Sequence, residues 1–69
     1  EDFVVADGLY EAIVGIDPQA MRLIYSVEKC VTILADRDTM STESAREFLE
    51  FNTFGAYVGE KTPIWMETF

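Results

Sequence analysis

The cysteine and histidine content sets the first limit on how this chain can fold. Cys30 is the single cysteine among 69 residues, and histidine is absent. A domain of this length buries only about 60% of its unfolded surface and commonly relies on disulfides, a metal or self-association for stability. A disulfide within the chain is impossible and a metal is disfavoured, so we expect a homo-oligomer, most simply a dimer, without a cofactor. A well-packed monomer is the alternative.

The chain is acidic yet rich in apolar residues. Hydrophobic residues make up 49% of it, which is too many for a disordered segment, so we expect one small folded domain over residues 1–69. The net charge is -8 and the basic residues are scattered, so direct nucleic-acid binding is disfavoured. No apolar run is long enough to span a bilayer and no leader opens the chain, so we expect a soluble, cytoplasmic protein that does not enter a membrane.

The clearest secondary-structure signal is a helical stripe that begins at Val27. Apolar residues recur there at spacings of three and four as far as Leu34, and Ser26 stands where a helix cap is needed. Cys30 falls on this stripe, which is typical of a small buried hydrophobe rather than of a reactive thiol.

A second helix is expected from about Thr42 to Phe54. Ser41 is its candidate cap, and Gly55 is expected to end it in a left-handed conformation. The short connection predicts that the two helices form an antiparallel hairpin. The side chains expected to face inward are Ala45, Phe48, Leu49 and either Phe51 or Asn52.

The segments on either side of the helices are less regular. We expect residues 1–8 to be a flexible arm and Asp7 to cap a short helix over Leu9–Val14. Short strands are expected at Met21–Tyr25 and near Ile64–Met66, paired with each other. The predicted fold class is therefore α+β and helix-dominated, with a short N-terminal helix, a central antiparallel helix hairpin and two short strands.

Catalytic signatures are missing from the sequence. Histidine is absent and glycines occur singly, so the common bases, metal-ligand sets and phosphate loops are not present. Asp36, Asp38 and Glu43 do not have the spacing of a calcium loop. We therefore expect no catalytic residues and no metal site, and we interpret the protein as non-enzymatic.

The loop and strand after the second helix are the predicted interaction surface. Loops carry binding groups more often than helices do, and aromatic side chains anchor interfaces. We therefore expect Tyr57, Glu60 and Trp65 to contact a partner. The alternative is that Tyr57 and Trp65 close the core over the helices.

Carboxylates gather around the second helix, at Asp36, Asp38, Glu43, Glu47 and Glu50. Such a cluster is typical of a solvated helix face that aids solubility. It is also the kind of surface that competes with a nucleic acid for a basic groove, and both interpretations stay open here.

Several short motifs together resemble a known group of proteins. They are Arg22-Leu23-Ile24-Tyr25-Ser26, Glu28-Lys29-Cys30, Phe51-Asn52, Gly55-Ala56-Tyr57-Val58-Gly59-Glu60 and Thr62-Pro63-Ile64. This combination resembles a group of short uncharacterised proteins from bacteriophage and bacterial genomes, in which a glycine often replaces Thr39. The resemblance implies a viral or mobile-element origin in the bacterial cytoplasm and brings no site residues.

The function predicted from these observations is protein interaction. We expect a phage accessory protein that acts on a host factor. The alternative is a nucleic-acid mimic that inhibits a defence or DNA-processing protein.

Overall fold

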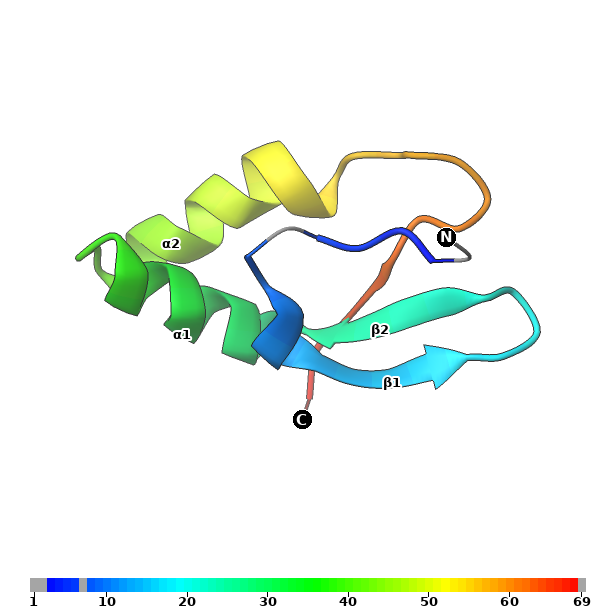
Figure 1. Ribbon diagram of the computed structural model, residues 1–69. Helices are drawn as coiled ribbons and strands as arrows, with labels where there is room; N and C mark the ends of the chain where they lie inside the picture. Colours follow the sequence, from blue (N-terminus) through cyan, green and yellow to red (C-terminus); the bar gives the residue numbers. More distant parts are fainter. Residues whose placement is uncertain (1–2, 7, 69) are drawn as a thin grey trace.

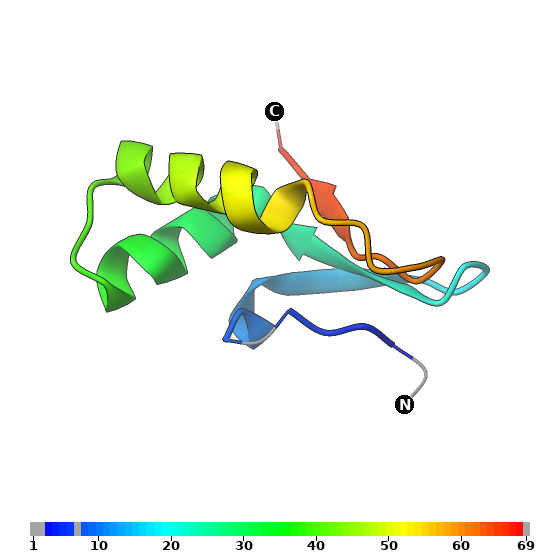
Figure 2. The same cartoon turned by 90° about the horizontal axis from the view of Figure 1, so that it is seen from above.

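The computed structural model describes residues 3–6 and 8–68, and in this part of the chain a three-stranded sheet lies beside two α-helices (Figure 1). In chain order the elements are the 3-10 turn η1 (Tyr10–Ala12), β1 (Ile13–Asp17), β2 (Arg22–Ser26), α1 (Val27–Arg37), α2 (Thr42–Leu49), the π-helical η2 (Glu50–Phe54) and β3 (Ile64–Met66). Figure 2 shows the helices and the sheet still end to end after a 90° turn, along the 35 Å axis of the molecule. The helices therefore extend the sheet and do not cover its face.

β2 is the central strand and pairs differently on its two sides. β1 runs antiparallel to it, with Ile13 opposite Tyr25 and an irregularity in the register between Ile13 and Gly15. β3 runs parallel to it, with Trp65 beside Tyr25. The strands expected at Met21–Tyr25 and Ile64–Met66 thus correspond to β2 and β3, and β1 is a strand that the sequence reading missed.

The expected N-terminal helix over Leu9–Val14 is wrong. Only a 3-10 turn forms, and the chain then enters β1, along which side chains alternate between half-buried and exposed. The helical spacing of Leu9, Ile13 and Ile16 is overridden, because the β-branched side chains of this segment favour a strand once β2 offers a partner. Asp7, the expected cap of that helix, lies outside the described residues.

A tight connection joins β1 to β2. The carboxylate Oδ1 of Asp17 accepts hydrogen bonds from the backbone N–H groups of Gln19 and Ala20, at 3.2 and 3.4 Å. Met21 then adopts φ 56°, in the left-handed region, before the chain returns as β2. An Asp-Pro pair with a left-handed residue later in the same connection is typical of a β-hairpin, and it explains why β1 and β2 are adjacent.

The predicted helix at Val27 is confirmed as α1, and it continues directly from β2. The Ser26 hydroxyl oxygen accepts a hydrogen bond from the Lys29 N–H at 3.2 Å, which caps the helix. Thr39, in the turn after α1, has φ 53°, and the Ser41 hydroxyl then caps α2 through the Ser44 N–H.

The antiparallel helix hairpin expected over Ser26–Phe54 is also wrong. α1 is the continuation of a central strand, and α2 keeps α geometry for only 8 residues before η2 begins. The expected left-handed stop at Gly55 is wrong as well, because its φ is -90°. The fold is therefore organised around a three-stranded mixed sheet in the described residues, with α1 and α2 packed on each other at its end.

The core forms where the two halves of the molecule meet. The buried apolar side chains are Leu9, Ala12, Tyr25, Val27, Cys30, Val31, Leu34, Ala45 and Leu49. Tyr25 is fully buried, and its hydroxyl accepts a hydrogen bond from the Ala6 N–H at 2.7 Å. Burial raises the pKa of Tyr25 above its ordinary value, and the Ala6 N–H partly opposes this shift. Tyr25 thus ties Ala6 to the core, whereas residues 1, 2 and 7 of the expected arm lie outside the described residues.

Candidate functional site

The three interaction residues predicted from the sequence lie in two different environments. Tyr57 is 77% exposed and Glu60 is exposed, both in the loop between η2 and β3. Trp65 lies in β3, half-buried and packed against the core. Among the described residues no hydrogen bond or ring contact joins the three side chains. The structure therefore does not bring them together as one site.

Trp65 is the middle ring of a stack of three. Its ring centroid is 5.0 Å from that of Tyr25 and 4.8 Å from that of Phe54, with tilts of 38° and 40°. Its indole Nε1 is buried and has no hydrogen-bond partner in the described part of the protein. Ring contacts of this kind are worth about 0.5–1.5 kcal/mol each beyond the area they bury. The geometry is that of a residue that joins β2, β3 and η2.

The π-helical turn η2 decides which aromatic side chain completes this stack. The hydrogen bonds of a π-helix join residues five apart, and at the end of this widened turn Phe54 packs against the core and reaches Trp65. In a regular α-helix, Phe54 would be rotated well away from Leu49. The side-chain amide of Asn52 donates to the Phe48 carbonyl oxygen at 3.0 Å, which gives that carbonyl a partner in the widened turn.

Two aromatic side chains of α2 and η2 lie on the outside of the molecule. Phe51 is 91% exposed, Phe48 is 47% exposed and Asn52 is exposed as well, so the expectation that Phe48 and either Phe51 or Asn52 face inward is wrong. They line a shallow hollow of about 610 Å³ on the outer side of α2 and η2. We call this surface the aromatic face, and its residues are Met40, Ser44, Glu47, Phe48, Glu50, Phe51 and Asn52.

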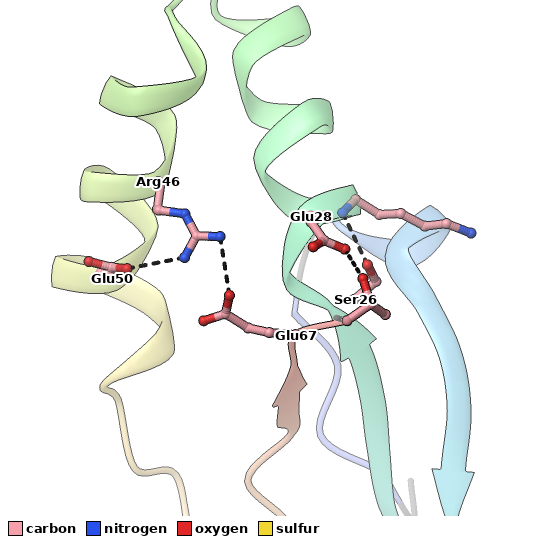
Figure 3. Close-up of polar contacts among 7 residues, drawn as sticks. Ser26, Glu28, Arg46, Glu50 and Glu67 are labelled. Atoms are coloured by element: carbon pink, nitrogen blue, oxygen red, sulfur yellow. Dashed lines mark hydrogen bonds and ion pairs between the residues drawn. The ribbon is translucent and has the colours of Figure 1, made fainter.

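The charge of the aromatic face is negative. Two carboxylates, Glu47 and Glu50, stand among the described residues that line it, and no base does. Arg46 lies beside it, but its guanidinium is bound to Glu50 and Glu67, each at 3.4 Å (Figure 3). The hydrogen bond that Arg46 donates to the Glu67 carboxylate is the main cause that raises the pKa of Arg46. Glu47 takes part in no ion pair of the described residues, so none of them neutralises its charge.

The segment that follows β3 contacts both α-helices. Glu67 bonds to Arg46 on α2, and the Thr68 hydroxyl donates to a carboxylate oxygen of Glu28 on α1 (Figure 3). These exposed contacts contribute little stability individually. They do fix the direction in which Arg46 points, which is toward β3 and its following segment.

The other groups that could react or bind a metal are either buried or not clustered in the described residues. Cys30 is fully buried, and burial raises the pKa of its thiol to about 11, so it stays protonated and unreactive near neutral pH. Within the residues that the structure describes, no group of three metal-ligating side chains gathers. No helix in the same residues combines the length and apolar character needed to cross a membrane.

The chain matches no family model, no curated protein and no solved structure. The site is therefore defined by geometry alone. Sequence reasoning missed the aromatic face because Phe48 and Phe51 continue an apolar helical pattern, and such a pattern is normally buried. The signal that could have indicated otherwise is the spacing from Leu49, because two residues further along a helix Phe51 is turned about 200° away from it.

Proposed function

We propose that this chain is a non-enzymatic protein-interaction module and that the aromatic face is its binding surface. The observation that carries the proposal is the 91% exposure of Phe51 next to the half-exposed Phe48. Aromatic side chains are the most frequent anchors of protein interfaces, and monomeric proteins seldom leave neighbouring ones exposed without a role. A partner that covers both rings would remove apolar surface that folding leaves in water.

The finer form of the proposal follows the sequence resemblance. It makes the chain a phage accessory protein that acts on a host protein in the bacterial cytoplasm. The homodimer predicted from the composition stays a prediction of this proposal, and sedimentation at micromolar concentration tests it. A species of only 7.8 kDa, the mass of one chain, would contradict the dimer and leave the interaction module intact.

A comparison of matched variants tests the binding surface. Wild-type protein, Phe51→Ser and Tyr57→Ser are each immobilised and exposed to bacterial lysate. Both substitutions remove an exposed aromatic side chain, so neither should change folding, and circular dichroism checks this. We expect a protein that is retained by the wild type and by Tyr57→Ser and is lost with Phe51→Ser.

The salt dependence of retention separates the two functional classes. An apolar interface anchored by Phe51 keeps most of its affinity at high salt, whereas a nucleic-acid mimic loses its basic partner. The proposal would be overturned in favour of the mimic if Phe51→Ser retained the lysate protein as the wild type does and high salt abolished this retention. Loss with Tyr57→Ser alone would move the surface to the loop predicted from the sequence.

A further inference from the structure

Given the proposed function, on which this inference rests, we infer that the aromatic face binds a cationic amphipathic helix of its partner. The partner helix carries apolar side chains on one side and Lys or Arg at the edge of that side. A second copy of the chain is the competing occupant, and charge distinguishes the two.

Charge complementarity identifies the partner as basic. Glu47 and Glu50 stand in the hollow beside the two phenylalanines, and the nearest base, Arg46, is turned toward Glu50 and Glu67. A Lys or Arg on the partner can therefore approach Glu47 without competing with a base of this chain. A two-fold dimer through the same face would place these carboxylates against their copies, and like charges at an interface oppose association. The net charge of -8 acts in the same direction.

The shape of the face favours a helix as the bound segment. Ser44, Phe48 and Phe51 follow one another along the exposed side of α2 and η2, over roughly 10 Å of helix axis. Ser44 is small and allows a neighbouring helix to approach closely, while Phe51 projects almost fully into solvent. The row formed by Ser44, Phe48 and Phe51 can pack between the side-chain rows of another helix, whose apolar residues recur at spacings of three and four.

Two designed peptides test this inference directly. Both are helices of about 18 residues, roughly 27 Å long, with the same leucine positions; one has lysine and the other glutamate on its polar side. Binding is measured by fluorescence anisotropy at about 0.15 M salt and at higher salt. The protein variants are Phe51→Ser with its control Tyr57→Ser, and Glu47→Gln with its control Glu60→Gln. Each control removes the same kind of group from the exposed loop.

We expect the leucine–lysine peptide to bind the wild type. Phe51→Ser should weaken binding at least about tenfold, and Glu47→Gln about two- to threefold with a smaller salt dependence. Tyr57→Ser and Glu60→Gln should bind as the wild type does. Equal losses for Glu47→Gln and Glu60→Gln would show unspecific attraction between a cationic peptide and an acidic protein, and would overturn the inference.

Other outcomes separate the inference from the proposed function. Equal binding of the leucine–glutamate peptide, or self-association that Phe51→Ser abolishes, would overturn the cationic partner while the aromatic face kept its role. If Phe51→Ser changed neither peptide binding nor retention of a lysate protein, the inference and the proposed function would both be wrong.

Discussion

Two replacements of Trp65 distinguish two effects on stability. One is the stabilisation that its ring contacts provide, and the other is the cost of burying its N–H group without a partner. Trp65→Ala removes the contacts with Tyr25 and Phe54 and leaves a cavity where β2, β3 and η2 meet. We expect the free energy of unfolding to fall by about 3–5 kcal/mol. Trp65→Phe keeps a ring in the stack and removes the unpartnered Nε1–H, whose burial costs about 1–3 kcal/mol. This second change should therefore cost less than about 1.5 kcal/mol.

Urea unfolding followed by far-ultraviolet circular dichroism measures both effects. Fluorescence is unsuitable because Trp65 is the single tryptophan. A 69-residue domain has a total stability of roughly 3–10 kcal/mol, so Trp65→Ala should leave much of the protein unfolded. Tyr57→Ala, at a 77% exposed ring, is the control and should stay within about 0.5 kcal/mol of the wild type. An unchanged midpoint for Trp65→Ala would refute the core role, and equal damage from both Trp65 variants would refute the cost assigned to the N–H.

Four further predictions concern the backbone geometry at three positions and the buried thiol of Cys30. Thr39→Gly should stabilise the protein by about 0.5–1 kcal/mol, because the β-branched threonine is held at φ 53°. Calorimetry should show a higher melting temperature, and a lower one would contradict this prediction. Gly55→Ala should change stability by less than about 0.5 kcal/mol, since its φ is -90° and an added Cβ would lie 3.7 Å from the Glu50 carbonyl oxygen. Gly59→Ala, at φ 108°, should cost at least about 1 kcal/mol in the same urea assay. Burial raises the pKa of the Cys30 thiol from 9.0 to about 11, so stability should fall by up to roughly 3 kcal/mol as the pH rises through this window. Cys30→Ala should flatten that fall, and an identical pH profile would show that another group causes it.

Local signals in the sequence were sufficient wherever one element determines its own boundaries. Ser26 is followed by apolar residues at helical spacing, and α1 begins where that pattern predicts. The strand at Ile64–Met66 was likewise predicted from its proline start and its β-favouring residues. In both cases the chemistry that starts the element lies within a few residues of it.

The missed strand β1 depends on a partner instead. Ile13 and its neighbours are compatible with a helix or with a strand, and only the hairpin formed at Asp17 selects the strand by supplying β2. The sequence-predicted interaction residues failed to converge for a related reason. The pairing of the strands that hold Tyr25 and Trp65 was predicted, but its register was not, and this register places Trp65 beside the buried Tyr25.

The π-helical turn matters for the core of this protein more than for its proposed binding surface. Residues five apart in a regular α-helix are turned about 140° from each other, so α geometry after Leu49 would carry Phe54 away from Trp65. Phe51 does not depend on this turn, because two residues after Leu49 it is turned about 200° away and faces solvent in α geometry as well. A change that restores α geometry in η2 should therefore weaken the tryptophan stack and leave Phe51 exposed, so the stability of the core and the binding surface can be altered independently.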